Sequence, residues 1–300
     1  MSNSQSLEHP VAVLGLGIMG SALARNLLNG GFAVQGFDPD TGSATNAAQN
    51  GVTILETASE AVQGCRYILS SLPSESALLT TVDALTSGRP DPDLKPVLVE
   101  LSTLSIESKE KARNGLSQSG VDMLDCPISG TGAQAETKDI VLYVSGDEDT
   151  FTSCQVIFEA IARDRFFLGA FGNGMRMKFI ANLLVAIHNV ASGEALALAT
   201  KAGLDPQKVL DVISSGAGSS KIFELRGPMM VRETYEPATM KLDVWQKDMA
   251  LINDFARELG ATTPLFDKTQ PLYEAANERG LGDQDTAAVH KAFIQPVAKD

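Results

Sequence analysis

The chain has 300 residues, 44% of them hydrophobic, and a formal net charge of −13. This length and hydrophobic content are sufficient for a large core and for one to three domains. The negative charge argues against nucleic acid and anionic membrane surfaces as partners, because both are themselves negatively charged.

Cysteine usage and hydropathy indicate the compartment. The three cysteines are Cys65, Cys126 and Cys154. They are widely spaced and form no CxxC pair, which favours free thiols in a reducing compartment. The polar start, MSNSQSLEHP, lacks the features of a signal peptide. The most apolar long stretch, residues 179–200, contains Asn182, His188, Asn189 and Glu194 and is too polar for a membrane span. We therefore expect a cytoplasmic protein.

The first half of the chain alternates strand-like and helix-like segments. From residue 11, VAVLGLGIMGSALARNLLNGGFAVQGFD predicts a strand, a glycine turn, a helix and a second strand that ends at Asp38. Further strand patterns are CRYILSSLP, PVLVELST, VDMLDCP, DIVLYVSG and RFFLG, with helical patterns between several of them. Strands that alternate with helices imply βαβ units and a doubly wound, mainly parallel sheet.

The pattern changes after about Gly169, and no convincing strand is found from Met175 onward. Helical periodicity predicts helices at residues 175–201, 205–214, 222–232, 243–259 and 265–279. We therefore predict an α/β N-terminal domain at residues 1–170 and an all-α domain at residues 171–300. The apolar surface of the predicted helices indicates a partner subunit as well as a core.

A glycine-rich motif joins the first predicted strand to the first helix. It consists of Gly15, Leu16, Gly17, Ile18, Met19 and Gly20. In a dinucleotide site, Gly15 permits the tight turn, Gly17 lets the backbone approach a pyrophosphate, and Gly20 allows close packing of helix and strand. The helix N-terminus supplies amides and a positive dipole. The alternative is a glycine-rich turn that binds nothing.

Asp38 ends the second predicted strand, where a dinucleotide site requires an acidic residue. Its carboxylate can accept hydrogen bonds from the adenosine ribose and would repel a 2′-phosphate. No arginine follows at Pro39 or Asp40. The expected cofactor is therefore NAD, with NADP less favoured.

Polar residues follow three further predicted strands, at the edge where the ends of parallel strands meet. These clusters are Leu72-Pro73-Ser74, Ser102-Thr103 and residues 125–132, DCPISGTG. Each cluster alone is also compatible with ordinary turn chemistry.

Lys178 and Asn182 lie four residues apart on a predicted apolar helix, and Asn189 continues the same polar stripe. A solvated helix edge, a structural ion pair for Lys178 and a functional site remain open on this spacing alone.

The glycine turn, the DxPxSG loop and the GxGxxxKxxxN helix, in this order, resemble the β-hydroxyacid dehydrogenase family. Its members include 3-hydroxyisobutyrate, L-threonate and tartronate semialdehyde enzymes. The segment VWQKDMALINDFARELG resembles the Lys-Asp helix of the family, so the resemblance spans almost the whole chain. It implies a Rossmann domain followed by a helical domain of the 6-phosphogluconate dehydrogenase type, in homodimers or homotetramers.

The resemblance also implies roles for individual residues. Lys178 would be the catalytic acid/base, with Asn182 binding the substrate beside it. Ser129, Gly130 and Thr131 match the substrate loop, where the family commonly has Ser-Gly-Gly, so Thr131 is a departure. The positions that match cofactor contacts are Leu72, Pro73, Thr103 and Lys247.

The implied reaction is hydride transfer between a nicotinamide cofactor and a small 3-hydroxy acid, or reduction of its semialdehyde. A lysine with its ordinary pKa of about 10.4 is a poor base, but an apolar pocket can lower this value towards about 7–8. Residues 214–228 resemble the L-threonate dehydrogenase branch, where Ser219, Ser220 and Lys221 could bind a polyhydroxylated acid, or they form a flexible loop.

Two alternative functions remain. An imine reductase resembles this family in sequence, but another residue usually occupies its lysine position. A non-catalytic NAD-binding sensor or scaffold would leave Lys178 and Asn182 without a purpose. A metal site is not expected, because His9, His188 and His290 are isolated from one another in the sequence.

Overall fold

The computed structural model describes residues 9–88 and 91–294. By its contacts the chain divides into two compact units, Met1–Lys178 and Phe179–Asp300. The polar stretch on which the signal-peptide interpretation rests lies largely outside the described residues. The domain boundary expected at residues 170/171 stays a prediction.

The first unit is built on a six-stranded parallel sheet in the order β3-β2-β1-β4-β5-β6. The strands are β1 (Val11–Leu14), β2 (Val34–Phe37), β3 (Thr53–Ile54), β4 (Tyr67–Ser70), β5 (Val97–Glu100) and β6 (Asp122–Asp125). This order is that of the doubly wound dinucleotide-binding fold, with its switch point between β1 and β4. The predicted α/β class is therefore confirmed. Among these six strands, only the two-residue strand β3 escaped prediction, because it is too short to show a pattern.

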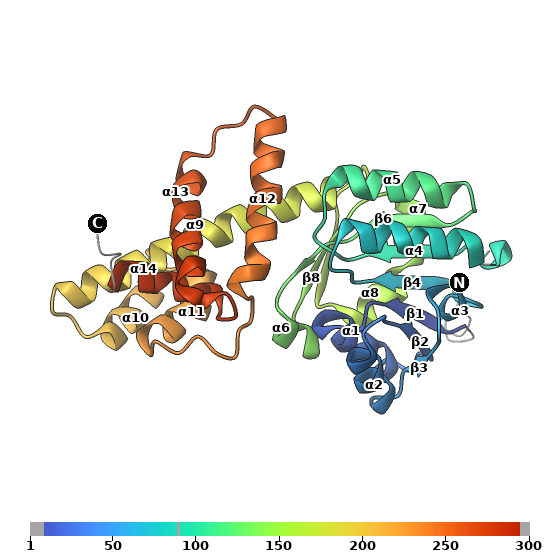
Figure 1. Cartoon of the computed structure of the whole chain (residues 1–300), viewed down its shortest axis with the longest axis horizontal. Coiled ribbons are helices and arrows are strands. Elements are labelled where there is room, and N and C mark those ends of the chain that lie inside the picture. Colours follow the sequence, from blue (N-terminus) through green and yellow to red (C-terminus); the bar gives the residue numbers. More distant parts are fainter. Residues whose placement is uncertain (1–8, 89–90, 295–300) are drawn as a thin grey trace. The chain divides into compact units, whose positions relative to one another are not determined.

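Helices cover both faces of this sheet (Figure 1). They are α1 (Ile18–Asn29), α2 (Thr41–Gln49), α3 (Ala58–Ala61), α4 (Glu75–Gly88), α5 (Ile106–Ser117), α6 (Gly132–Glu136), α7 (Glu148–Ser153) and α8 (Gln155–Ile161), with a short turn at Pro92–Leu94. Alternate residues of β1 pack into two different hydrophobic cores, one on each face of the sheet. Val11 and Val13 pack with α1 and α8, whereas Ala12 and Leu14 pack with α3, α4 and α5. A strand buried on both faces explains the unbroken apolar run of β1.

A second, three-stranded sheet follows in the order β7-β8-β9. Its strands are β7 (Ile128–Ser129), β8 (Val141–Val144) and β9 (Asp164–Phe167). β7 pairs antiparallel with β8, and β8 pairs parallel with β9. A single bridge between Asp125 and Ser145 joins the end of β6 to the end of β8. The DxPxSG motif at residues 125–130 therefore runs from the large sheet directly into the small one.

The second unit is helical throughout its described residues, apart from an isolated bridge between Lys241 and Asp285. Its helices are the greater part of α9 (Asn173–Lys201), then α10 (Pro206–Ser214), α11 (Lys221–Val231), α12 (Leu242–Glu258), α13 (Pro264–Ala276) and α14 (Lys291–Ile294), with short turns at Asn277–Leu281 and Thr286–His290. All five predicted helices are present, with ends that agree to within a few residues.

By length and composition α9 would also pass for a membrane-spanning helix. The polar residue at its middle, Asn189, instead has partners within the helical unit. Asn189 is buried and donates to the Tyr273 hydroxyl (3.0 Å) and to the Thr286 carbonyl (2.8 Å). We interpret α9 as the core helix of this unit, because buried amides require such partners. Asn189 therefore has a structural role, although it continues the stripe of Lys178 and Asn182.

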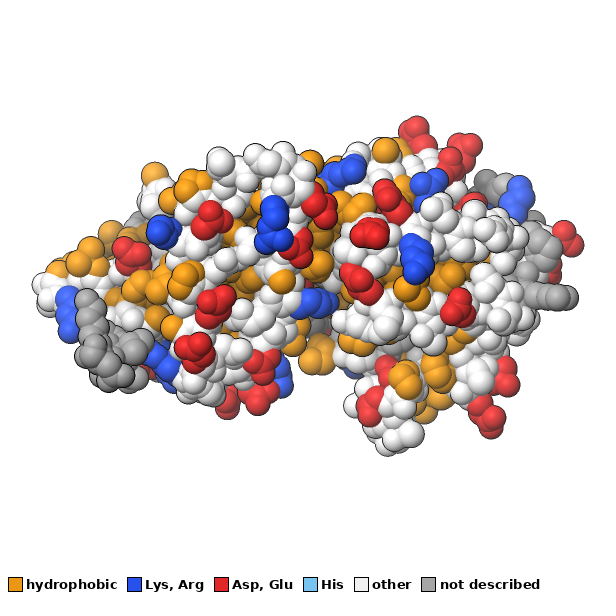
Figure 2. All heavy atoms as spheres, turned by 45° about the horizontal axis from the view of Figure 1, so that its top comes forward, with side chains coloured by type: hydrophobic (Ala, Val, Ile, Leu, Met, Phe, Trp, Pro, Cys, Tyr) orange, Lys and Arg blue, Asp and Glu red, His pale blue; other side chains and the backbone are white. Residues whose placement is uncertain are grey.

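The three cysteines are free and buried, as expected from their spacing. Burial raises the pKa of Cys65 and of Cys154 to about 12, and the pKa of Cys126 also lies well above its ordinary value. These thiols stay protonated and are unsuited to nucleophilic chemistry. On the face shown in Figure 2, acidic and basic side chains are interspersed.

Candidate active site

Two glycines of the 15–20 turn are required by the protein itself. Gly15 has a φ of +85°, and a Cβ there would lie 2.2 Å from the Ser71 carbonyl oxygen. A Cβ on Gly20 would lie 1.8 Å from the carbonyl oxygen of Gly15. The turn can therefore close only with glycine at both positions.

Gly17 differs from these two glycines, because no atom of the described chain lies within 4 Å of where its Cβ would be. Gly17 is also the N-cap of α1, and no side chain in the described ranges caps it. Its missing Cβ leaves space above first-turn amides, which is what a pyrophosphate needs. The turn therefore fits a dinucleotide cofactor.

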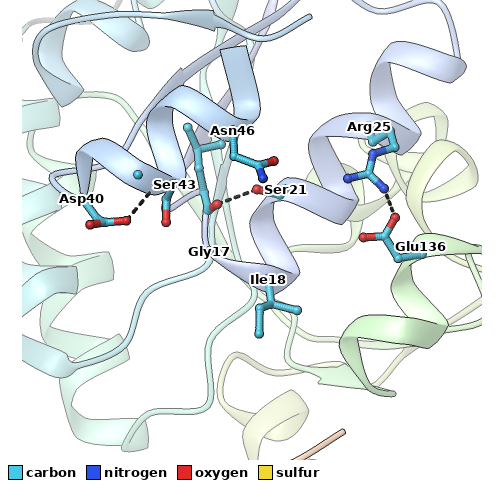
Figure 3. A pocket seen from close by; sticks show the side chains of 10 residues that line it. Gly17, Ile18, Ser21, Arg25, Asp40, Ser43, Asn46 and Glu136 are labelled. Carbon is cyan, nitrogen blue, oxygen red and sulfur yellow. Dashed lines mark hydrogen bonds and ion pairs between the residues drawn. The ribbon is translucent and has the colours of Figure 1, made fainter. Parts of the chain in front are cut away.

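A pocket of about 480 Å³ lies beside this turn (Figure 3). It is lined by Leu16, Gly17, Ile18, Ser21, Arg25, Asp40, Gly42, Ser43, Asn46 and Glu136. Sequence reasoning anticipated the first three and missed the others. The N-capping pattern at the start of α2 was the available signal for Asp40, which accepts a hydrogen bond from the Ser43 N–H (2.8 Å). This bond and the Ser43 hydroxyl hold the pKa of Asp40 below its ordinary value, so Asp40 is charged at neutral pH.

Asp38 does not line this pocket but supports its wall. Its carboxylate accepts hydrogen bonds from the backbone N–H of Leu16 (2.6 Å) and of Asp40 (2.8 Å). Each carboxylate oxygen has a second lone pair and can still accept a ribose hydroxyl. The carboxylate thus joins the glycine turn to the start of α2.

The pocket also contains an arginine that the sequence argument overlooked. Arg25 on α1 forms an ion pair with Glu136 on α6 (Figure 3). The backbone carbonyl of Ala135 accepts a hydrogen bond from Asn26 beside it (2.7 Å). The substrate-loop helix α6 is therefore fastened to the cofactor helix α1, and the Arg25 charge is already neutralised.

The loops after β4 and β5 lie side by side at the carboxyl edge of the sheet. The Ser102 hydroxyl accepts a hydrogen bond from the Leu72 N–H (2.8 Å). This contact joins the chain at Leu72 to the chain at Ser102, which directly precede Pro73 and Thr103. The common role of Leu72, Pro73 and Thr103 as cofactor contacts stays a prediction. Pro73 is exposed, and Leu72 and Thr103 are half-buried.

The substrate-loop candidates Ser129, Gly130 and Thr131 are half-buried. Gly130 has a φ of +146°, and a Cβ there would lie 2.7 Å from a methyl group of Ile140. Thr131 is the N-cap of α6 and forms a reciprocal capping box with Gln134. The threonine that departs from the family pattern thus has a local structural role.

Lys178 is buried, with 8% of its surface exposed, and its ammonium donates a hydrogen bond to the Ile128 carbonyl (2.6 Å). Ile128 directly precedes the Ser129-Gly130 pair. Lys178 is therefore neither on a solvated edge nor remote from the candidate substrate loop. This contact uses one of the three N–H groups that an ammonium carries.

Asn182 follows Lys178 by about one turn of α9 and belongs to the helical unit. It is buried and donates to the carboxylate of Asp248 (2.9 Å), which orients its amide. Asp248 is the acidic member of the predicted Lys-Asp pair, and its neighbour Lys247 is exposed on α12.

In the 214–228 stretch, Ser220 caps α11 through the Phe223 N–H (3.1 Å), and Lys221 forms a surface ion pair with Glu224. These contacts are ordinary helix-start chemistry.

Comparison with known proteins agrees with this geometry. Residues 10–171 match the family described as the NAD binding domain of 6-phosphogluconate dehydrogenase. Residues 172–293 match the family described as NAD-binding of NADP-dependent 3-hydroxyisobutyrate dehydrogenase.

Individual relatives align along nearly their whole length. Glyoxylate/succinic semialdehyde reductase 1 of Arabidopsis thaliana is 29% identical over 94% of this chain and 97% of its own. L-threonate dehydrogenase of Cupriavidus necator is 30% identical over 96% of this chain and 97% of its own. The structure of Mycobacterium tuberculosis 3-hydroxyisobutyrate dehydrogenase, solved with L-serine, is 28% identical and superimposes with a TM-score of 0.85, covering 95% of this chain and 98% of that one. The chain therefore belongs to the β-hydroxyacid dehydrogenase family and is an NAD(P)-dependent oxidoreductase.

Proposed function

We propose that the protein transfers a hydride between NAD and a small 3-hydroxy acid or its semialdehyde, with Lys178 as the general acid/base. One observation carries this proposal: a buried lysine amine is fixed against the Ile128 carbonyl, at the start of the candidate substrate loop. NAD, when bound at the glycine turn, supplies the hydride acceptor for the alcohol carbon.

The chain then has to remove the hydroxyl proton. Neutral Lys178 has one lone pair for this proton while an N–H still donates to Ile128, so the amine keeps its direction in both protonation states. In the reverse direction the ammonium polarises the carbonyl and returns the proton. Asn182, oriented by Asp248, and the Ser129–Thr131 loop are proposed to bind the substrate.

The proposed preference for NAD rests on charge at the pocket beside the glycine turn. In the contacts described at this pocket, neither Asp38 nor Asp40 is paired with a basic side chain. Arg25, which lines the pocket, is paired with Glu136. A 2′-phosphate would meet this excess of negative charge. We propose Leu72, Pro73, Thr103 and Lys247 as further cofactor contacts.

The proposed substrate class is a small hydroxy acid or the corresponding aldehyde acid. Relatives are named for the hydroxy acids 3-hydroxyisobutyrate and L-threonate and for the aldehyde acids glyoxylate and succinic semialdehyde. We also propose a cytoplasmic homodimer or homotetramer. A screen of these acids and aldehydes, with cyclic imines included, followed at the reduced-nicotinamide absorbance, tests the substrate class. Turnover of imines alone would contradict it.

Replacing Lys178 tests the mechanism. Lys178→Ala is expected to lower kcat by about 10²–10⁴-fold, because a positioned acid/base contributes about this much. NAD affinity should stay unchanged, since the cofactor contacts lie elsewhere. Lys178→Arg should also be poor, because a guanidinium keeps its proton.

Lys201→Ala, at the exposed end of the same helix, is the matched control and should retain activity. The variants are compared by steady-state kinetics, NAD binding and melting temperature. Near-normal turnover in well-folded Lys178→Ala would refute the mechanism, and a binding-only scaffold would show no turnover in any variant.

A further inference from the structure

Lys109, Glu100 and Asp125 form a buried triad of charged side chains, to which the proposed mechanism assigns no role. The Lys109 amine on α5 lies 2.6 Å from Glu100 and 2.8 Å from Asp125, at the ends of β5 and β6. All three side chains are 0% exposed. Buried ion pairs are costly to desolvate and contribute little net stability compared with apolar packing, so such a triad calls for a geometric role.

The triad carries one excess negative charge, and α9 compensates it. Asp125 uses one carboxylate oxygen for Lys109 and the other to accept the backbone N–H of Met175 (2.9 Å). The same oxygen accepts the Ser145 hydroxyl (3.0 Å), whose oxygen in turn accepts the N–H of Gly174 (2.9 Å). First-turn amides and the helix dipole are the natural partners of such a carboxylate.

Close packing shows that the start of α9 has little freedom. A Cβ on Gly174 would lie 2.4 Å from the Tyr143 carbonyl oxygen and 2.8 Å from a carboxylate oxygen of Asp125. The second glycine of the GxGxxxK motif is therefore explained by this contact.

Asp125 is linked to both partners of the hydrogen bond between Lys178 and Ile128. Along the chain it precedes Ile128 by three residues, and through space it holds Met175, which precedes Lys178 by three residues. Burial alone would lower the pKa of Lys109, but Asp125 and Glu100 outweigh it and raise that pKa, so the amine stays charged.

The triad also reaches the loops of the cofactor side. The second oxygen of Glu100 accepts the Ser102 N–H (3.0 Å), and the Ser102 hydroxyl accepts the Leu72 N–H. One buried cluster is therefore bonded to the β4 and β5 loops and to the start of the lysine helix.

We propose that Lys109, Glu100, Asp125 and Ser145 are positioning residues that clamp the N-terminus of α9 and thereby fix the Lys178 amine against Ile128. This inference rests on the proposed role of Lys178. The proposed role of the triad is to set the position of the Lys178 amine, which is distinct from a contribution to the free energy of unfolding.

The test compares two variants with a control in the same unit. Ser145→Ala removes the hydroxyl that joins Gly174 to Asp125, and Lys109→Met removes the amine but keeps the stem. Ser70→Ala makes the same chemical change as Ser145→Ala at another fully buried serine, whose hydroxyl has no hydrogen-bond partner among the described residues.

Both variants should show faster amide hydrogen exchange in a peptide covering residues 172–180. Their kcat should fall, by up to about 100-fold, because a displacement of about 1 Å can cost that much. KM for NAD should stay unchanged in Ser145→Ala, and Ser70→Ala should behave like the parent protein. A purely structural triad would lower the melting temperature but leave kcat per folded molecule unchanged.

If Lys109→Met does not fold, the result for Ser145→Ala alone tests the proposal. Folded Ser145→Ala with parental hydrogen exchange and parental kcat overturns the inference. Lys178→Ala is measured alongside: if that variant keeps its turnover, the proposed function fails, while hydrogen exchange still shows whether the clamp exists.

Discussion

Single residues of the glycine turn divide into those that the fold needs and one that it does not. Gly15 and Gly20 are enclosed by backbone carbonyls, whereas the side of Gly17 where a Cβ would be is open. Gly17 also has a φ of −63°, which any residue adopts. The motif therefore combines two glycines that the fold requires with one open position that the proposed cofactor site uses.

We predict opposite effects of alanine at the two kinds of position. Gly20→Ala should destabilise the protein by about 1–3 kcal/mol or more, because the added methyl overpacks a rigid turn. Gly17→Ala should leave the melting temperature nearly unchanged and weaken NAD binding. Thermal unfolding with NAD titration measures both effects. A stable Gly17→Ala protein with parental NAD affinity would contradict the cofactor assignment.

The acidic residues beside the turn predict cofactor selectivity. The parent enzyme should be more efficient with NAD than with NADP, and Asp38→Ala should narrow the gap by about 10-fold or more, corresponding to at least about 1.4 kcal/mol of removed repulsion. Asp211→Ala, at an exposed position on α10, changes the net charge equally and serves as the control. Steady-state kinetics with both cofactors provides the measurement, and parity in the parent enzyme would refute the role of Asp38.

Among the elements, the turn at Thr286–His290 links pH to the stability of the helical unit. His290 is buried, and its Nδ1 lies 3.1 Å from the Tyr235 hydroxyl. Burial lowers the pKa of His290 below the ordinary histidine value of 6.5. The folded state therefore resists a proton that the unfolded state binds readily.

This linkage has a defined sign. The stabilising contribution of neutral His290 is complete above pH of about 6.5 and is lost as pH falls towards the depressed folded-state pKa. The melting temperature should therefore fall between pH 7 and pH 5, and His290→Gln should flatten this part of the profile. Scanning calorimetry across this range is the measurement, and an identical slope in both proteins would exclude His290 as the cause.

For the molecule as a whole, the helical unit exposes large apolar side chains, and orange side chains are visible on its surface in Figure 2. Leu198 and Val212 are each 70% exposed in the single chain. Apolar surface of this kind is typical of subunit interfaces. It supports the proposal that the helical unit carries the oligomer contact.

Light scattering should therefore give at least twice the chain mass of 31.7 kDa. Leu198→Glu should shift the protein towards monomer, because an interface buries charge at high cost. Phe166→Glu, at a 53% exposed position in the dinucleotide-binding unit, is the matched control and should leave the mass unchanged. A parent protein of 31.7 kDa at micromolar concentration would contradict the proposal.

Features that depend on near neighbours along the chain can be predicted from the amino-acid sequence. The periods of two and 3.6 residues located the strands and the helices, and the strand–turn–helix context located the glycine turn. The pairing of Lys178 with Asn182 along one helix followed in the same way. The two-residue strands β3 and β7 were not predicted, because two residues are too few to show a periodic pattern.

Contacts between residues that are distant in the sequence became known from the folded structure. Asp125 reaches Met175 across fifty positions, and Arg25 reaches Glu136 across 111. The fold also gives Asn182 and Asn189 different partners, Asp248 for the first and the Thr286 carbonyl for the second, although both occupy the same helical stripe. Burial and pairing depend on which distant segments the fold packs together. A local sequence pattern does not identify the distant segment that will pack against it.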